Sequence, residues 1–346
     1  MTVPEGVPPR ARLGGLRGVA IGVVCLVAVV AILFHQGTLD PARFGAALHA
    51  MGVLPLLVGL GGGVGVIALQ TLRWWSLTRP VATLRYRDAF ATVLVGGLLN
   101  TVLPAHAGDV LRVQYLSDRT GVGRATLLGT EVLDVWADKA GWLPAFALFA
   151  AMGSPPPWMY RGLAVMLGGA VVLLGALSIV RGRMRHAGGG SGLGARFSQA
   201  LTRTSWRRLA FAGLGLGALP WVWEALAIQR VAAAAGVPLA ALQAFVLLSA
   251  FNLASLVPVP GNVGTFEAAS GSVLMSFGVP AETAIAFSLV YHLSQLLPYV
   301  IGGGLALLVW RLAPAPSTAT LLPIPSNSLV VADAASRATR GPPWKA

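Results

Sequence analysis

Charged residues and cysteine are both scarce in this sequence. Asp, Glu, Lys and Arg make up only 11% of the 346 residues, whereas 55% are hydrophobic and the mean hydropathy is +0.73. Because a soluble domain cannot bury so large an apolar fraction, the composition predicts a polytopic membrane protein. The single cysteine, Cys25, excludes an intramolecular disulfide and offers no thiol metal site.

Sequence motifs of several common enzyme classes are missing as well. The chain has no Walker loop, no Gly-x-Ser-x-Gly nucleophile motif and no dinucleotide-binding fingerprint that follows a strand. Its five histidines lack the spacing of metal ligands, so we expect neither a metal nor another cofactor. A formal charge of +13 would suggest nucleic-acid binding in a soluble chain. Here the basic residues follow membrane topology, and we expect no nucleic-acid partner.

The long apolar runs predict the membrane topology. Six of them have spanning length, at residues 18–34, 53–72, 127–151, 162–180, 209–229 and 284–310. Two more, 89–103 and 241–257, are short and end at Pro and Gly residues. We interpret these two as arms of re-entrant hairpins over 89–112 and 241–267, because irregular backbone at membrane depth must be surrounded by protein or water. The predicted fold class is all-α, with six full transmembrane helices and two re-entrant hairpins.

This topology divides the chain into two membrane halves, residues 18–180 and 209–312. Between them, residues 181–208 hold seven arginines and a Gly/Ser run, which predicts a flexible cytoplasmic linker. Residues 1–17 and 313–346 are expected to be disordered cytoplasmic ends. Most of the 25 Lys and Arg residues, including those of a predicted loop at 73–87, then lie on the cytoplasmic side of the cell membrane.

The two predicted hairpins repeat the same order of residues: an Asn, a Pro/Gly break and an acid. Since they would enter from opposite sides, the halves resemble an inverted repeat. Transporters with such repeats hold their substrate near the bilayer midplane, between broken helices. The residues that mark the two breaks are Asn100, Pro104, Gly108, Asn252, Pro258, Pro260, Gly261 and Gly264.

Ionisable residues inside the run 127–151 indicate a polar site. Glu131, Asp134 and Asp138 fall within about 60° of one another around an ideal helix, and Lys139 lies nearby. A charge at membrane depth costs about 3 kcal/mol, so such residues mark a cavity for a charged group or a proton. The alternative is a buried structural network, in which the acids pair with Arg112, with Lys139 or with one another.

Residues at the two breaks offer complementary chemistry. Arg112 presents a planar fork that suits a lipid phosphate, although an i, i+3 pair with Asp109 would explain both residues structurally. The segment 258–267 can expose backbone amides to an anion at the next helix start. A rigid loop with Glu267 in a salt bridge explains its prolines equally well. On the last span we rank packing above a proton relay for His292, which shares one side with Tyr291 and Gln295.

Three motifs stand in this order along the chain: Gly108-Asp109-x-x-Arg112 after Pro104, Glu131-x-x-Asp134, and Pro258-x-Pro260-Gly261-x-x-Gly264-x-x-Glu267. Together they resemble the lysylphosphatidylglycerol synthase transmembrane region family, a flippase-like membrane domain. The resemblance extends over residues 18–311 and implies two inverted re-entrant repeats that move a lipid headgroup between leaflets. The family pattern commonly has Glu in the first motif, Arg after the Glu of the second and a further Gly in the third, where this chain has Asp109, Val132 and Asn262.

Bifunctional members of that family add a soluble aminoacyl transferase domain after the membrane part. About 35 residues follow Arg311, which is too few for such a domain. We therefore predict a lipid translocase and no enzyme activity. Its substrate would be a phospholipid or a polyprenyl-phosphate-linked lipid. The predicted substrate-binding residues are Asp109, Arg112, Glu131, Asp134, Asp138, Lys139 and Glu267.

Two other functions fit the same residues. A membrane-embedded transferase that acts on a lipid carrier would need a metal-binding acid pair, for which Asp109 and Asp118 are the candidates. A non-transporting scaffold for a lipid-processing enzyme would be insensitive to neutralising Glu131 or Glu267. Besides the membrane lipid, the partners to consider are a second copy of the chain and a lipid-synthesising enzyme.

Overall fold

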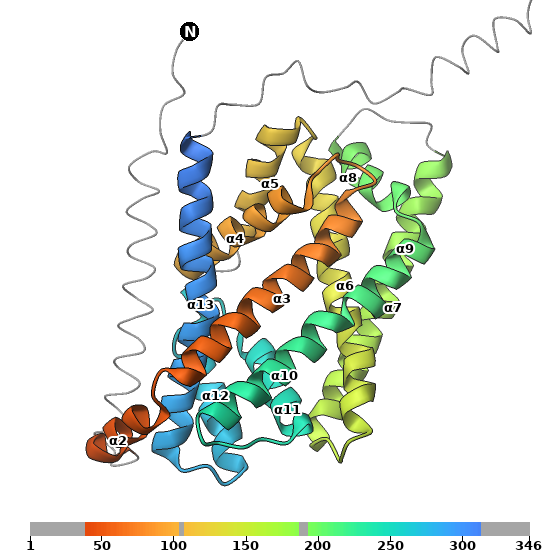
Figure 1. Ribbon diagram of the computed structural model, residues 1–346. Coiled ribbons are helices and arrows are strands. Elements are labelled where there is room, and N and C mark those ends of the chain that lie inside the picture. Colours follow the sequence, from red (N-terminus) through yellow and green to blue (C-terminus); the bar gives the residue numbers. More distant parts are fainter. Residues whose placement is uncertain (1–38, 104–106, 187–192, 313–346) are drawn as a thin grey trace, which may run out of the picture. The chain divides into compact units, whose positions relative to one another are not determined.

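The structure is a computed structural model that describes residues 39–103, 107–186 and 193–312 (Figure 1). These residues form helices and no strand, which confirms the all-α prediction. Within the described ranges, four helical stretches are long and apolar enough to cross a membrane: Leu54–Thr78, Pro157–Val180, Trp206–Ala234 and Ala281–Val309. The predicted first span and both predicted disordered ends, 1–17 and 313–346, lie outside the described residues.

Helix α6 (Arg124–Ala150) is the element on which the others converge. It packs against α3 (Leu54–Thr78), α5 (Ala107–Thr120), α8 (Leu193–Arg203) and α10 (Ala218–Ala234). Its 27 residues would extend for about 40 Å at 1.5 Å per residue, enough to cross a bilayer. It is absent from the four apolar stretches because four charged residues lie near its middle: Glu131, Asp134, Asp138 and Lys139.

Two pairs of shorter helices occupy the positions of the predicted hairpins. Helix α4 (Tyr86–Val102) packs on α5, and α11 (Ala241–Ala254) packs on α12 (Thr265–Ser276). In Figure 1 the first pair lies toward the top of the bundle and the second toward the bottom. With 17 residues α4 is shorter than the roughly 20 residues of a spanning helix, and α11 has only 14. Pro104 lies outside the described residues.

Two boundaries differ from the predictions. The basic loop expected at 73–87 is shorter, because α3 continues to Thr78 and α4 begins at Tyr86; Arg73 is therefore a buried helical residue. The flexible linker expected at 181–208 is largely helical: α7 (Pro157–His186) enters it, α8 lies within it, and α9 (Trp206–Ala210) begins in it. Helix α8 approaches α6 so closely that a Cβ on Gly129 would lie 2.8 Å from the Cβ of Ala200. The glycine run at 188–192 is outside the described residues.

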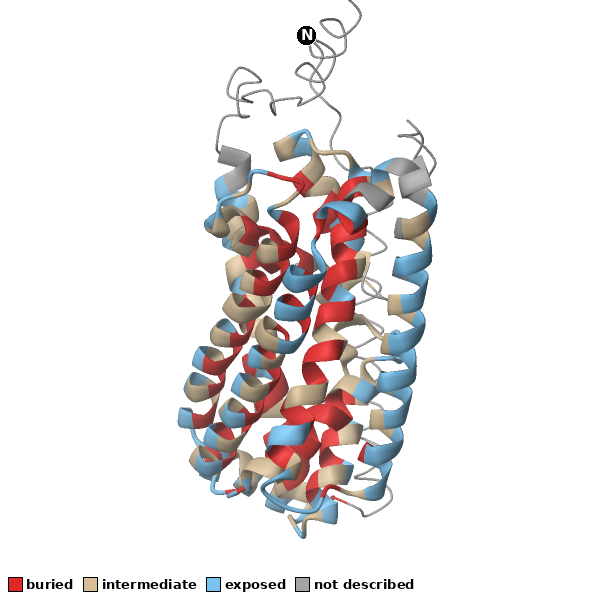
Figure 2. Ribbon diagram, turned by 90° about the vertical axis from the view of Figure 1, so that its right-hand side faces the viewer, coloured by how far each residue is buried: buried red, intermediate tan, exposed pale blue. Residues whose placement is uncertain are grey.

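Apolar side chains fill the space between the helices. In Figure 2 the residues coloured as buried lie along the inner faces of the helices. The largest cluster includes stacked rings, among them Phe149 and Phe245 with centroids 4.7 Å apart. Helix α7, in contrast, exposes apolar residues such as Val165 and Val172. Exposed valines on a long apolar helix are the pattern of a lipid-facing span.

The remaining elements complete the chain between these helices. A single π-helical stretch, η1 (Phe211–Leu216), joins α9 to α10, and α13 (Ala281–Leu312) ends the described residues. Helix α2 (Pro41–Met51) begins at Asp40, whose carboxylate accepts hydrogen bonds from the backbone N–H groups of Arg43 and Ala42. Those bonds, the one from Arg43 foremost, lower the pKa of the Asp40 carboxyl below its ordinary value.

Candidate functional site

Two of the acids of α6, Asp134 and Asp138, are held by an arginine from α3. Arg73 donates from Nε to Asp134 Oδ1 at 2.8 Å and from Nη1 to Asp138 Oδ1 at 2.7 Å. On its other side Asp138 pairs with Lys139 Nζ at 2.9 Å, and that ammonium lies 5.6 Å from the ring centroid of Trp221. One guanidinium thus bridges two carboxylates one helical turn apart, which is a pairing that the sequence analysis did not include.

A second buried pair joins α5 to α6. Arg112 donates from Nε to Glu131 Oε1 at 3.2 Å, and its Nη2 contacts Glu131 Oε2, so the contact is bidentate. The Arg112 guanidinium also lies 4.9 Å from the ring centroid of Trp74 and 3.8 Å from Asp109 Oδ1. The sequence pattern named both Asp109 and Glu131 as partners of Arg112; in the structure Glu131 is the closer one.

The first break is closed by an asparagine side chain. Asn100, near the end of α4, accepts a hydrogen bond from the Gly108 N–H at 2.7 Å and donates to Asp109 Oδ1 at 3.1 Å. Gly108 lies so close to α4 that a Cβ there would be 2.7 Å from the Asn100 backbone N. Asn100 and Gly108 therefore fix the start of α5 against the end of α4.

The second break is a tight turn that needs left-handed backbone. Gly261, Asn262 and Gly264 have φ of 59°, 56° and 86°, which glycine adopts without steric cost and which asparagine tolerates better than most residues. Glu267 Oε2 accepts a hydrogen bond from the Gly264 N–H at 2.7 Å, so the acid caps its own helix, α12. Its Oε1 lies 2.6 Å from His292 Nδ1 on α13.

The two breaks lie next to each other. Helix α4 packs against the short helix η2 (Pro260–Asn262) that follows α11. A Cβ on Gly261 would lie 3.3 Å from the backbone oxygen of Thr101, one residue before the end of α4. Residues about 160 positions apart in the chain thus bring the tips of both helical pairs into contact.

A small polar cavity of about 50 Å³ opens beside the acids of α6. It receives a carboxylate from α6, Asp138, and another from α10, Glu224. Tyr291 on α13 donates from its hydroxyl to Glu224 Oε1 at 3.4 Å. The other lining residues are Gln70, Pro220, Trp221 and Asn252.

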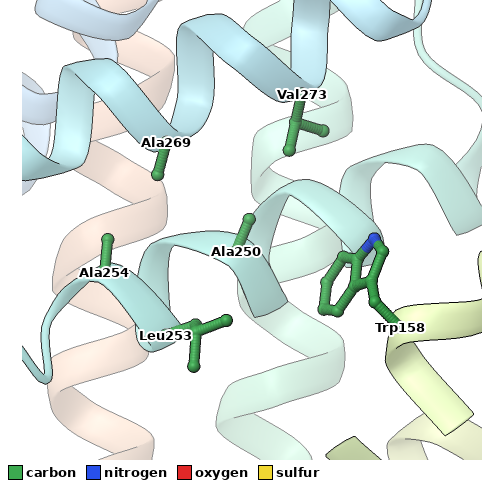
Figure 3. A pocket seen from close by; sticks show the side chains of 6 residues that line it. All are labelled: Trp158, Ala250, Leu253, Ala254, Ala269 and Val273. Atoms are coloured by element: carbon green, nitrogen blue, oxygen red, sulfur yellow. The ribbon is translucent and has the colours of Figure 1, made fainter. Parts of the chain in front are cut away.

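An apolar pocket of about 290 Å³ lies at the second helical pair, on the side of α11 that faces α7 (Figure 3). Helix α11 therefore contributes Asn252 to the polar cavity and its neighbour Leu253 to this pocket. The other residues that line it are Trp158, Ala250, Ala254, Ala269 and Val273.

The predicted site residues fall into two groups in the structure. Six of the seven lie in the networks between α3, α5 and α6: Asp109, Arg112, Glu131, Asp134, Asp138 and Lys139. Glu267 is separate from them and contacts His292, for which packing had been ranked first. Pro258 and Pro260 flank the start of the second turn, and Asn252 donates to the Leu248 carbonyl at 3.1 Å.

Sequence reasoning missed Arg73 and gave no role to Glu224. Arg73 closes the apolar run of its helix and precedes two tryptophans, so it looked like the first residue of a loop. Glu224 stood out only as a lone acid in an apolar run, which was the signal available.

Asp109 and Asp118, the candidate metal pair, lie nine residues apart on one helix, about 13 Å along its axis. Among the described residues, no three His, Cys, Asp or Glu side chains are grouped for a metal ion.

Comparison with known proteins identifies one family. The family model described as Lysylphosphatidylglycerol synthase TM region matches residues 18–303 of the chain. Neither the curated proteins nor the solved structures give a match. The matched range contains every charged residue of the two networks and both breaks.

Proposed function

Because the chain belongs to the lysylphosphatidylglycerol synthase TM region family, we propose that it moves a phospholipid or a polyprenyl-phosphate-linked lipid between leaflets. Its apolar helices and its family make it a multi-pass membrane protein related to lipid handling. The observation that carries the proposal is the pair of buried networks built on Arg73 and Arg112. Such charges at membrane depth are costly, and by default they mark a substrate or ion path.

The proposed topology has six full spans, namely residues 18–34, the four apolar stretches and α6. The pairs α4–α5 and α11–α12 would be the two re-entrant hairpins of an inverted repeat. Three observations support this arrangement: the helices are short, each pair packs together, and the Thr101 backbone lies next to Gly261. The protein would lie in the cell membrane, with both termini on the cytoplasmic side.

The geometry suggests how a headgroup would bind. Arg112 is held at both Nε and Nη2 by Glu131, so a lipid phosphate must compete with that carboxylate for the guanidinium. Lys139 is easier to reach, since 44% of its side chain is exposed and it has one carboxylate partner in the structure, Asp138. A cationic group on the headgroup would compete in the same way with Arg73 for Asp134 and Asp138.

Alternating access follows from this exchange of partners. A ligand shifts a conformational equilibrium only by its differential affinity for the two states. Here the ion pairs between α6 and its neighbours α3 and α5 define one state, and a headgroup that replaces Glu131 at Arg112 would favour another. The residues proposed to contact the lipid are Asp109, Arg112, Glu131, Asp134, Asp138, Lys139 and Glu267.

The test is leaflet exchange of fluorescent lipids in proteoliposomes. The headgroups to compare are anionic phospholipid, lysyl-modified phospholipid and polyprenyl phosphate. We expect the wild type to accelerate exchange of one of them, and Lys139→Ala, Arg112→Ala and Glu267→Gln to reduce that rate at least tenfold. Arg85→Ala, which removes an exposed arginine, is the matched control.

Folding must be separated from transport in this assay. Size-exclusion profiles and thermal midpoints of each variant establish that it is folded, and Lys139→Ala is the variant least expected to unfold because its side chain is the most exposed of the three. If no headgroup exchanges faster with folded protein and divalent metal supplied, the translocase proposal is wrong. That result favours a scaffold or a lipid-carrier transferase.

A further inference from the structure

His292 lies between two hydrogen-bond acceptors. Its Nδ1 is 2.6 Å from Glu267 Oε1, and its Nε2 is 2.9 Å from the backbone oxygen of Gly261. Only 7% of the His292 side chain and 4% of the Glu267 side chain are exposed. The imidazole also stacks on Phe266, with the ring centroids 4.3 Å apart. The ring is therefore fixed in place with both nitrogens engaged.

These contacts determine how many hydrogens the pair holds. A backbone carbonyl only accepts, so Nε2 must carry a hydrogen. The contact between Nδ1 and Glu267 needs a second hydrogen, either on the ring or on the carboxyl group. A neutral imidazole beside an ionised carboxylate has only one N–H, so one of the two contacts would lack a hydrogen. To make both hydrogen bonds, the pair must hold one proton more than neutral His292 with ionised Glu267.

Release of that proton decides which of the two acceptors keeps its hydrogen bond. With Glu267 ionised and His292 neutral, the single N–H can serve the carboxylate or the Gly261 carbonyl. Hydrogen bonds to a charged acceptor are about twice as strong as neutral ones, so the N–H goes to Glu267. Gly261 then faces the lone pair of Nε2 and loses its donor. Because Gly261 also lies against Thr101 of α4, the contact between the two breaks weakens.

We propose that Glu267 and His292 form a proton-binding site that closes the turn of the second break, and that release of the proton opens this turn. The ligand is a proton, which passes between the pair and water. Proton binding is a second role for Glu267, beside the lipid contact proposed above. It holds whether or not the chain translocates lipid.

Few other ionisable groups face this pair from the elements packed around it. Glu267 itself comes from α12, while on α13 the neighbours of His292 are Tyr291 and the uncharged Gln295. Glu224 of α10 lies behind Tyr291, and its hydrogen bond is to that hydroxyl. The short helix η2 presents the uncharged backbone oxygen of Gly261 to His292, and behind Gly261 lies the uncharged Thr101 backbone of α4. Within the described residues no Lys or Arg forms an ion pair with Glu267.

Hydrogen–deuterium exchange of the protein in lipid nanodiscs, from pH 5.5 to 9, tests the site with the proton as the probe. The peptide that covers residues 258–267 reports the turn, and one over the exposed residues 151–154 corrects for the intrinsic pH dependence of exchange. In the wild type we expect corrected exchange of the turn to become at least about tenfold faster as pH rises.

Two variants should lose the pH dependence of exchange that is expected for the wild-type turn. Glu267→Gln removes the competing carboxylate, so Nε2–H stays on Gly261 and the turn stays protected at pH 9. His292→Gln replaces the imidazole by a side chain that does not ionise, so the contact at Gly261 no longer responds to pH and the tenfold increase should be lost, although Glu267 stays ionisable. His49→Gln, in the exposed part of α2, should behave as the wild type does. The proposal is wrong if the wild-type turn shows no corrected pH dependence, or if either variant of the pair retains it.

Discussion

Arg73 on α3 donates to both carboxylate oxygens of Asp134 on α6, from Nε at 2.8 Å and from Nη2 at 3.3 Å. The two side chains are 5% and 9% exposed, so water contributes little to their solvation. A buried pair of this kind is not strong evidence for stability, because desolvation offsets much of the attraction. Its geometry does fix the position of α3 relative to α6, which is where the proposed headgroup site lies.

Replacement of Arg73 by Gln should destabilise the protein strongly. The change leaves Asp134 without its buried cation and Asp138 with Lys139 only, and breaking one partner of a buried pair costs about 3 kcal/mol or more. We expect a lower midpoint of thermal unfolding in detergent, followed by tryptophan fluorescence. Arg85→Gln removes an exposed arginine and should change stability by about 0.5 kcal/mol or less. Equal effects of both substitutions would show that the Arg73 contacts are energetically unimportant.

Arg112 and Glu131 should behave as a coupled pair. Each single substitution, Arg112→Met or Glu131→Gln, leaves one buried charge without its bidentate partner. The double variant leaves neither, so its loss of stability should be smaller than the sum of the single losses by about 1–3 kcal/mol. Chemical or thermal unfolding of the four proteins measures this coupling. Additive losses would mean that the two side chains do not stabilise each other in the membrane.

Much of this architecture is readable in the sequence because it depends on local pattern. Apolar runs, Pro and Gly breaks and the spacing of Glu131, Asp134 and Asp138 are properties of single segments. They predicted the helices and the shared face of the acids. The pairing of Arg112 with Glu131 was part of the buried structural network considered as an alternative, and the structure contains this pair.

What the sequence did not reveal depends on contacts between distant segments. Arg73 meets Asp134 from 61 positions away, and His292 meets Gly261 from 31. Contacts between residues so far apart in the chain produce no repeating pattern in the sequence. Arg73 was therefore placed in a loop, and His292 was ranked as a packing residue. The same limit applies to the linker, where the packing of α8 on α6 overrides a composition rich in arginine and glycine.

Gly108 is a position where a methyl group should separate the first helical pair. A Cβ there would overlap the Gly96 carbonyl and lie 2.6 Å from Asn100 Oδ1, the atom that accepts the Gly108 N–H. We expect Gly108→Ala to cost about 1–3 kcal/mol by overpacking. Gly162→Ala on α7 is the control, because no atom lies within 4 Å of the added Cβ and alanine favours the helix. Thermal midpoints compare the two variants.

The outcome for Gly108 also bears on the contact between the breaks. If α4 and α5 move apart, Thr101 at the end of α4 should shift away from Gly261, since the two are in contact. Faster hydrogen–deuterium exchange in residues 258–267 of Gly108→Ala is therefore expected, with no such change in Gly162→Ala. Unchanged exchange in both variants would indicate that the two breaks move independently.

Glu224 and Asp138 line the same polar cavity but should respond differently to neutralisation. Asp138 pairs with Arg73 and Lys139, whereas the partner that the structure shows for Glu224 is the hydroxyl of Tyr291. Removing a buried charge that lacks a cation is neutral or favourable, because no ion pair is lost while a desolvation cost is removed. Glu224→Gln should therefore keep or raise the thermal midpoint. Asp138→Asn should lower it, by about 2 kcal/mol in stability. If Glu224→Gln is as destabilising as Asp138→Asn, this expectation is wrong and the Glu224 carboxylate stabilises the fold through a contact beyond the Tyr291 hydroxyl.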